Sequence, residues 1–459
     1  MEKQKFRLFV RDKHFYLMLL AFALPICIQQ VINVGVNMAD NIMLGQLGEI
    51  QMSGATLGNN FINIYHAMCM GMGMGAGVLT SRFYGMGDQY SMKKAVVIMY
   101  RLEFLIATGF ALAVAFNASG IMGMYTTDPA IKAAGTGYLM ISIGTFYLNG
   151  YAVTSSVVLR SVGKAKVPMI SSICSFGVNI FFNWVFIFGH LGAPRMEARG
   201  AALGTLLARC VEFIVTVGYV IFKDTNIGLR VKDLTMKTGN LIKEYIRISI
   251  PVLVSDTLLG FGNSAVAMVM GHIGPSFVAA NAITMVVMQV STVINQGISQ
   301  ASCTITGITL GKGEIEKAQQ QGITFAALGF LIGAIGCTII NIISPFVISV
   351  YNITPETEAL AYQLMRAVSI TVFFTASNSI LTKGVLRGGG DTRFLMVADI
   401  LFLWVCSIPL GYAAGLVWHL SGFWIYLCLR IDQFIKSIWC LFRLRSRKWI
   451  KKIKNAQRE

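Results

Sequence analysis

Twelve long apolar runs, separated by short segments that hold most of the positive charge, constrain this chain more than any other feature. A helix needs about 20 mostly apolar residues to cross the hydrocarbon core of a bilayer. Only 13% of the 459 residues are charged, about half the share found in soluble proteins. We therefore predict an all-α polytopic membrane protein, surrounded by a lipid bilayer, with twelve transmembrane helices. The apolar runs lie at 15–44, 53–82, 95–118, 130–158, 167–190, 199–222, 241–271, 277–309, 320–349, 356–385, 394–418 and 421–442.

The distribution of charge predicts the orientation of these helices. A net charge of +17 is also found in proteins that bind nucleic acid, but most of the 38 Lys and Arg residues lie in alternate loops and at the two ends of the chain. The other loops hold only Lys132, Arg195 and Arg199. Because basic loops stay on the cytoplasmic side, we predict that both termini are cytoplasmic and that the chain binds no nucleic acid. The nine cysteines show neither disulfide nor metal-site spacing.

The chain contains an internal repeat. Eight pairs of residues share an offset of 226 positions, among them Pro25 with Pro251 and Gly87 with Gly313. Six helices return a chain to the side where it started, so the two copies have the same orientation, which suits alternating access to a central cleft. We predict an N-terminal six-helix lobe at 1–222, a cytoplasmic linker at 223–240, a C-terminal six-helix lobe at 241–442 and a basic tail at 443–459.

The first apolar run contains an acidic residue at bilayer depth. Gln30, Asn33, Asn37 and Asp40 are spaced by three, four and three residues, so they form one polar stripe on a helix. An ionised Asp at this depth costs about 2.5 to 3.5 kcal/mol even on lenient insertion scales. We therefore expect Asp40 to lie near water or a cation, or to be protonated. Pro25 interrupts the backbone hydrogen bonds of the same helix and predicts a hinge.

The fifth and sixth spans add polar groups that suit a cation site. Asn179 and Asn183 lie on one helical face, and Thr205 lies near the start of the sixth span. Together with Asp40 they offer a carboxylate, two amide oxygens and a hydroxyl, the oxygen set that a hard cation or a shared proton needs. The alternative is that the two amides only connect helices by hydrogen bonds.

Several charged residues inside the spans have a structural explanation on the same helix. In the repeat, Asp40 corresponds to Val266 in the second copy, and Asp256 corresponds to Gln30 in the first. The two acids therefore belong to different copies. Asp256 and Asp399 have no basic neighbour at helical spacing, so a cavity-facing role is an open alternative for each of them. Pairing along one helix is predicted for Arg209 with Glu212 and, less ideally, for Arg101 with Glu103, and pairing across helices is predicted for Arg430 with Asp432.

The two-lobed plan, the helix from Pro25 to Asp40 and the motif Leu386 to Thr392 resemble the multidrug and toxic compound extrusion (MATE) family, DinF-like bacterial branch. The resemblance implies a multi-pass protein of the bacterial cell membrane, not an enzyme, whose N-terminal lobe couples cation entry to drug export. It implies cation-coupling roles for Asp40, Asn179 and Thr205. Many members carry Asp at the position of Asn183, and the chain has Leu259 where another branch carries Glu.

We therefore predict a secondary active exporter that exchanges an inward proton or sodium ion for amphipathic, often cationic, small-molecule drugs. No resident cofactor is predicted, and no metal beyond a possible sodium ion at Asp40. One alternative is a flippase for a lipid-linked precursor, which would need basic residues such as Arg366 and Lys383 in the cleft. A membrane-embedded transferase would need clustered acids for a metal, and no such cluster is evident. The residues predicted to line the substrate cleft are Gln30, Asn33, Asn37, Asn63, Asp256, Asn263 and Met285.

Overall fold

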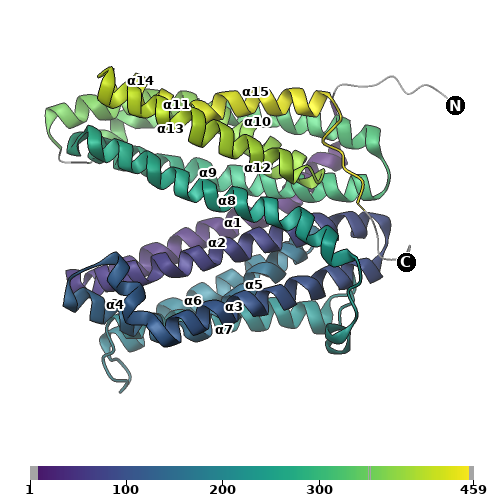
Figure 1. Cartoon of the computed structure of the whole chain (residues 1–459), viewed down its shortest axis with the longest axis horizontal. Coiled ribbons are helices and arrows are strands. Elements are labelled where there is room, and N and C mark those ends of the chain that lie inside the picture. Colours follow the sequence, from purple (N-terminus) through teal and green to yellow (C-terminus); the bar gives the residue numbers. More distant parts are fainter. Residues whose placement is uncertain (1–8, 350, 352, 454–459) are drawn as a thin grey trace. The chain divides into compact units, whose positions relative to one another are not determined.

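The computed structural model of the protein describes residues 9–349, 351 and 353–453, and these residues form helices joined by short turns (Figure 1). Within them, each of the twelve predicted spans coincides with one helical run, and no strand occurs, so the predicted all-α fold is confirmed. The first six runs are α1 (Lys13–Gly45), α2 (Glu49–Met86), α3 (Gln89–Tyr125), α4 (Pro129–Ile141) with α5 (Ile143–Ser161), α6 (Lys166–Phe188), and α7 (Ala198–Gly218) with η1 (Tyr219–Lys223).

The second six runs follow a linker that contains one short 3-10 helix, η2 (Val231–Thr235). Three of these six runs consist of more than one element, and all three lie in the second half of the unit. The six runs are α8 (Leu241–Ile273), α9 (Pro275–Gly311), α10 (Ile315–Ser349), α11 (Pro355–Ser379) with η3 (Ile380–Leu386), α12 (Thr392–Ile400) with η4 (Leu401–Ser407), α13 (Ile408–Tyr412) and η5 (Ala413–Val417), and α14 (Gly422–Leu429) with α15 (Ile431–Arg445).

Not all twelve runs are equally apolar. Among the described residues, eight are long and apolar enough to cross a membrane by length and composition alone, and a bent α9 would make nine. The remaining runs are α2, which is rich in glycine and asparagine, and the two runs divided near Ser142 and Arg430. Polar spans of this kind are tolerated where neighbouring helices of the protein surround them.

The repeat seen in the sequence is also a repeat of helices. The helices α1 and α8 each have 33 residues, while α2 and α9 have 38 and 37. Gly87 and Gly313, one of the repeated pairs, both follow the end of a long helix with positive φ values of 72° and 79°. Only glycine adopts this conformation without steric cost, so the same turn ends the second helix of both copies.

The described residues form two compact units whose limits fall inside helices. The N-terminal unit contains Pro25–Leu253, and the C-terminal unit contains the part of the chain before Pro25 together with Val254–Ile453. The sequence instead predicted that all of α1 belongs to the first lobe and all of α8 to the second. Both breaks lie at or near the repeated prolines Pro25 and Pro251, which remove a backbone hydrogen bond where the helix leaves one unit for the other.

Each unit is completed by the first part of a helix that then continues into the other unit. In the C-terminal unit, Phe15 of α1 packs against Phe325 of α10 with ring centroids 5.3 Å apart. In the N-terminal unit, the hydroxyl of Tyr245 on α8 donates to the backbone carbonyl of Met72 on α2 at 2.9 Å. These two segments, 13–24 of α1 and 241–253 of α8, lie at roughly equivalent positions of the repeat.

Close helix packing in the N-terminal unit depends on the glycines of α2. A Cβ atom at Gly75 would lie 1.9 Å from the hydroxyl oxygen of Ser249, and one at Gly73 would lie 3.2 Å from Val157. In a bilayer, helices associate mainly through such close packing, because lipid chains are as apolar as the side chains they replace. These glycines therefore allow α5 and α8 to approach α2 closely.

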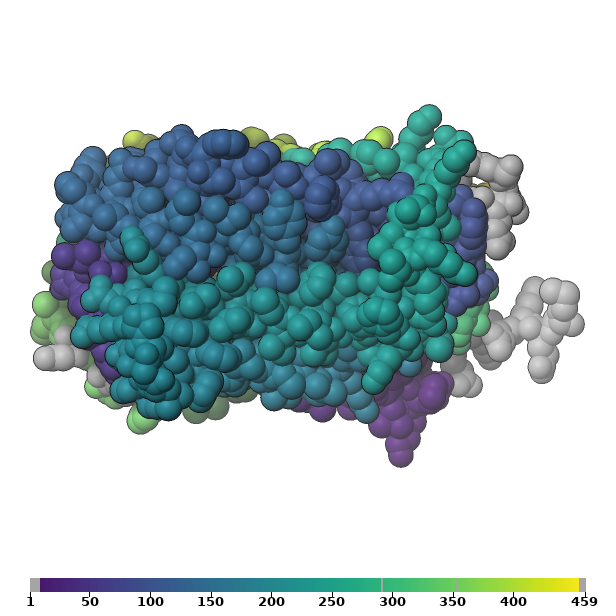
Figure 2. All heavy atoms as spheres, turned by 90° about the horizontal axis from the view of Figure 1, so that it is seen from below, coloured from purple at the N-terminus to yellow at the C-terminus, as the bar shows by residue number. Residues whose placement is uncertain are grey.

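The linker between α7 and α8 is held to the N-terminal unit by polar contacts with α3. The ammonium of Lys93 lies 3.0 Å from the carboxylate of Asp233 on η2. The guanidinium of Arg101 donates to the carbonyls of Leu234 and Met236 at 2.7 and 2.9 Å. Figure 2 shows this segment, in teal, over one end of the unit.

Candidate cation site in the N-terminal unit

Asp40 is held by a direct hydrogen bond from Asn183. The Nδ2 atom of Asn183 on α6 donates to Oδ1 of Asp40 on α1 at 2.5 Å, and it lies 3.3 Å from Oδ1 of Asn179. Asn179 also hydrogen-bonds with the Asp40 carboxyl group. Both asparagines are fully buried, whereas Asp40 is half-buried. The three predicted residues from α1 and α6 therefore form one cluster.

Thr205 joins the same cluster through a residue that the sequence did not single out. Tyr138 on α4 hydrogen-bonds with Thr205 on α7 and lies close enough to interact with the charges of Asp40 and Arg209. A tyrosine in an apolar run cannot be recognised from the sequence as part of a polar site, because its ring packs readily among apolar side chains. Only the packing of α4 against α7 reveals that its hydroxyl faces the polar cluster.

The geometry of Asn183 depends on a glycine in α7. A Cβ atom at Gly204 would lie 2.1 Å from Oδ1 of Asn183 and 3.0 Å from its backbone nitrogen. That Oδ1 atom is buried and has no hydrogen-bond partner. An orphaned buried carbonyl oxygen beside a carboxylate is costly on its own and is a ready ligand for a hard cation.

Within the described part of the chain, Arg209 is the strong base near Asp40, and it is engaged elsewhere. Arg209 on α7 pairs with Glu212 one turn later, with Nη1 and Oε2 2.5 Å apart, as the sequence predicted. Arg209 attracts Asp40 through space, but among the described residues no ion pair to Asp40 is formed. The carboxylate therefore has hydrogen-bond donors and lacks a resident counterion.

The remaining residues of the polar stripe on α1 are less buried. Asn33 and Asn37 are exposed and Gln30 is half-buried, while the neighbouring Gln29 is buried and donates to the hydroxyl of Ser172 at 3.0 Å. Asn63 on α2 and Met285 on α9 are also exposed. Their predicted role in a substrate cleft stays a prediction.

Asp256, the other predicted cleft acid, is bound to a base in the C-terminal unit. Its two carboxylate oxygens accept from Arg387, with the shorter distance 3.1 Å. Arg387 belongs to the motif that follows α11 and is 4% exposed. Asn263, which lies on α8 together with Asp256, accepts a hydrogen bond from Arg430 at 2.8 Å. Both predicted residues are thus engaged with arginines of their own unit.

Asp399 is likewise paired. The ammonium of Lys436 on α15 lies 3.1 Å from Asp399 and 3.0 Å from Asp432, and all three side chains are buried. Ser255 donates a further hydrogen bond to Asp399. The predicted pairing of Arg430 with Asp432 is therefore wrong, because Lys436, one turn further along α15, is the base that reaches Asp432.

The predicted pairing of Arg101 with Glu103 is also wrong. Residues two apart on a helix point in different directions, so Arg101 reaches the linker while Glu103 points into the unit. There Oε1 of Glu103 lies 2.6 Å from the hydroxyl of Tyr65. At the neighbouring position of α2, Nδ1 of His66 lies 3.3 Å from Nδ2 of Asn149.

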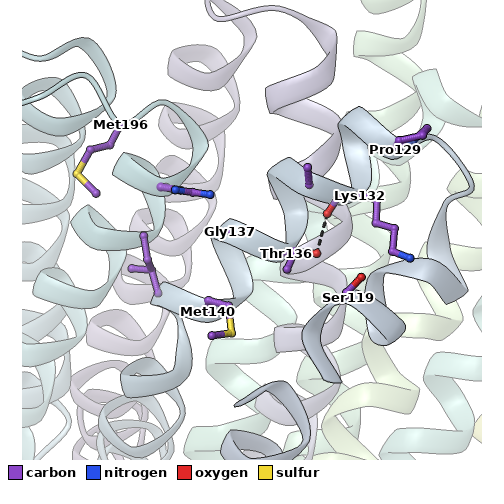
Figure 3. A pocket seen from close by; sticks show the side chains of 10 residues that line it. Ser119, Pro129, Lys132, Thr136, Gly137, Met140 and Met196 are labelled. Carbon is purple, nitrogen blue, oxygen red and sulfur yellow. Dashed lines mark hydrogen bonds between the residues drawn. The ribbon is translucent and has the colours of Figure 1, made fainter. Parts of the chain in front are cut away.

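A separate pocket of about 750 Å³ opens at one end of the N-terminal unit (Figure 3). Lys132 and Arg199, two of the three basic residues predicted for the outer loops, line it together with Met140 and Met196. Its positive charge does not suit a cationic drug. The pocket and the polar cluster around Asp40 use different residues of α4. Gly137 lines the pocket, whereas the next residue, Tyr138, faces the cluster.

Two copies of a six-span helical unit, with a counterion-free acid in one of them, define a polytopic membrane transporter. A family model described as MatE matches residues 25–185 and 251–413, so the chain belongs to the MatE family. The two matches begin at Pro25 and Pro251, the first of the repeated pairs. Members of this family are transporters rather than enzymes, and the recognition made from the sequence is confirmed.

Named relatives match along nearly the whole chain. A probable multidrug resistance protein NorM from Thermotoga maritima is 26% identical, with 95% of this chain and 93% of the relative covered. The multidrug resistance protein MdtK from Yersinia pestis is 23% identical, with 95% of both chains covered. The uncharacterized transporter YisQ from Bacillus subtilis is 23% identical, with 96% of both covered.

Solved structures share the fold. A MOP superfamily transporter from Pyrococcus furiosus has a TM-score of 0.83 at 18% identity, and 94% of this chain and 96% of that chain are covered. A MATE crystal structure in a straight conformation has a TM-score of 0.84 at 18% identity, and one in a bent conformation has 0.83 at 19%, with the same coverage.

Proposed function

We propose that this protein is a secondary active multidrug exporter in which an inward proton or sodium ion, bound at Asp40, is exchanged for an outward amphipathic, often cationic, drug. The family and the names of the relatives support export of drugs. The observation that carries the cation coupling is Asp40 itself, a carboxylate on a membrane-spanning helix that has amide donors and lacks a counterion.

Cation binding would act on the contact between α1 and α6. A hydrogen bond from an amide to an ionised carboxylate is about twice as strong as one to a neutral group. A proton or sodium ion at Asp40 neutralises the carboxylate and therefore weakens the hold of Asn183 on α1. Sodium would find its oxygen ligands at Asp40, Asn179, Asn183 and Thr205. In either case the cation favours a state in which α1 is released from α6.

Pro25 is the proposed hinge for this change. It lies inside α1 at the limit of the N-terminal unit, where one backbone hydrogen bond is missing. A change of contact at Asp40 can bend the helix at that residue. The description of a similar MATE protein in straight and bent conformations supports a fold that has two states.

The test is drug transport in proteoliposomes with a pH gradient or a sodium gradient imposed separately. We expect one gradient to drive efflux in the wild-type protein, and Asp40→Asn to abolish this coupling while the protein still inserts and stays folded. Asp128→Asn is the matched control, because Asp128 is an exposed helix cap and Asn caps a helix as well as Asp does. Full gradient-driven efflux by Asp40→Asn would contradict the proposal.

A flippase for a lipid-linked precursor is the second candidate. Basic residues gather in the C-terminal unit, where Arg387 binds Asp256 and Lys383 lies near enough to interact with the same carboxylate. Saturable binding of a labelled polyprenyl pyrophosphate sugar, together with no drug movement under either gradient, would favour the flippase over the exporter.

A further inference from the structure

Glu103 is a fully buried acid that the proposed mechanism does not use. It lies on α3 with no exposed surface, between α2 and α5. The space beside it exists because residue 150 is glycine, since a Cβ atom there would lie 2.0 Å from both Oε1 of Glu103 and the hydroxyl of Tyr65. Oε2 of Glu103 is buried and has no hydrogen-bond partner.

If Glu103 were ionised, there would be too few hydrogen atoms for the two short contacts that the Tyr65 hydroxyl makes. The hydroxyl oxygen of Tyr65 lies 2.6 Å from Oε1 of Glu103 and 2.5 Å from the carbonyl oxygen of Phe146. A tyrosine has one hydroxyl hydrogen, so it can make only one of these bonds at full strength. Both short distances are satisfied when Glu103 carries a proton and donates to Tyr65, while Tyr65 donates to Phe146.

The charges around Glu103 favour the same protonation state. Among the described residues no base pairs with it, and its remaining hydrogen-bond partner is the thiol of Cys69 at 3.2 Å, a weak donor. Arg101, on the same helix, is bound to the linker instead. Burying an ionised carboxylate without a counterion has a high free-energy cost, so such a group takes up a proton and becomes neutral. The titratable groups that face it from the other helices are Tyr65, Cys69, Tyr151 and Tyr245, none of them basic.

From this geometry we infer that Glu103 holds a proton in the described conformation and is a second proton-binding site of the N-terminal unit, separate from Asp40. Its proton can leave only when α2, α3 or α5 moves and admits water. Glu103 then gives the proton to a water molecule and becomes a carboxylate, and repacking of the helices requires that a proton be taken back from water. The site thereby couples closure of the unit to proton uptake, a consequence for transport that rests on the proposed exporter function.

Infrared spectroscopy of the purified protein tests the protonation directly. With ¹³C-labelled glutamate, the carboxyl band of a protonated glutamate separates from that of any aspartate, including Asp40. We expect one protonated glutamyl band at neutral pH, its loss in Glu103→Gln, and its shift without loss in Tyr65→Phe. Gln keeps the size and neutrality of the protonated acid, and Glu212→Gln is the control, because Glu212 is paired with Arg209.

The result that overturns the inference is absence of a protonated glutamyl band in labelled wild-type protein at neutral pH. This measurement needs no variant, so it stands even if Glu103→Gln does not fold. Persistence of the band in a folded Glu103→Gln protein would overturn it as well. Neither outcome depends on drug transport, so failure of the proposed exporter function and failure of the Glu103 site are told apart.

The consequence for transport is tested by proton uptake in proteoliposomes, followed with a pH-sensitive dye and compared with drug efflux. We expect Glu103→Gln to retain gradient-driven efflux and to take up fewer protons per drug molecule than wild type. Asp40→Asn should lose the coupling altogether. An unchanged ratio of protons to drug in Glu103→Gln would show that the Glu103 proton is structural and would overturn its role in coupling.

Discussion

The two units differ in whether all of the buried acids discussed above have a counterion. In the C-terminal unit, Asp256 is bound to Arg387, and Asp399 shares Lys436 with Asp432. In the N-terminal unit, Glu212 is likewise paired with Arg209, but Asp40 has amide partners and Glu103 a hydroxyl and a thiol, and among the described residues no base pairs with either of these two acids. Both copies thus carry fixed charge pairs, and the N-terminal copy also holds two acids without a counterion.

This difference separates structural acids from acids that can exchange a cation. A carboxylate already paired with a buried base gains little from a visiting proton or sodium ion, because the base supplies the positive charge. A carboxylate without a base has much to gain, and its charge changes when the cation leaves. We therefore expect the C-terminal unit to provide stability and the N-terminal unit to respond to the cation gradient.

The largest effect is expected from breaking the buried ion pairs of the C-terminal unit. Lys436→Met leaves Asp399 and Asp432 buried without a base, and removing one partner of such a pair costs about 3 to 5 kcal/mol. We expect a marked fall in the apparent melting temperature in detergent.

The control for this change is Lys317→Met, which breaks an exposed pair with Glu314 and should cost at most about 1 kcal/mol. Equal melting temperatures of the two variants would remove the distinction between the units, because Lys436 would then be no more important than a surface lysine.

A smaller effect is expected from disturbing Asp40 without changing any charge. In Gly204→Ala the new methyl group collides with Oδ1 of Asn183 and displaces the amide from Asp40. Overpacking of this kind costs about 1 to 3 kcal/mol. We also expect weaker cation coupling, measured as a higher proton or sodium concentration for half-maximal efflux.

Gly218→Ala on the same helix serves as the matched control, because nothing lies within 4 Å of its Cβ position. It should leave both stability and coupling close to wild type. If Gly204→Ala behaves in the same way, the contact between Asn183 and Asp40 does not set cation affinity.

The smallest effect is expected at a paired acid on the surface of the N-terminal unit. The hydrogen bond from Lys93 holds the pKa of Asp233 below its usual range. A lowered pKa in the folded state means that the contact stabilises the linker fully above the ordinary aspartate value of about 4, and that this contribution is lost as the pH falls through the folded value.

We expect pepsin to cut the linker faster as the pH falls through this range, and Lys93→Met to remove most of the pH dependence. The contribution of such a surface pair is below about 1 kcal/mol, so transport at neutral pH should change little. A cleavage rate with the same pH dependence in both proteins would show that the pair does not anchor the linker.

Much of the candidate site follows from helical periodicity. The spacing of Asn179 and Asn183 places both amides on one face, and the stripe on the first helix points to Asp40 as the odd residue. Periodicity, however, reports only neighbours on the same helix. It could not find Lys436 for Asp399, because these residues lie on different helices 37 positions apart, nor Tyr138 for Thr205. It also assigned Arg101 to Glu103, although the two side chains leave the helix in different directions.

The sequence by itself determined the twelve helical runs, the twofold repeat and the presence of an acid at bilayer depth, because apolar length and residue spacing are local properties of the chain. Tertiary structure alone decided which acids have a counterion, since a base from another helix must be brought within about 4 Å of the carboxylate. It also decided where the compact units end. A proline marks a weak point in a helix, but only the packing on either side shows that the helix changes partners there.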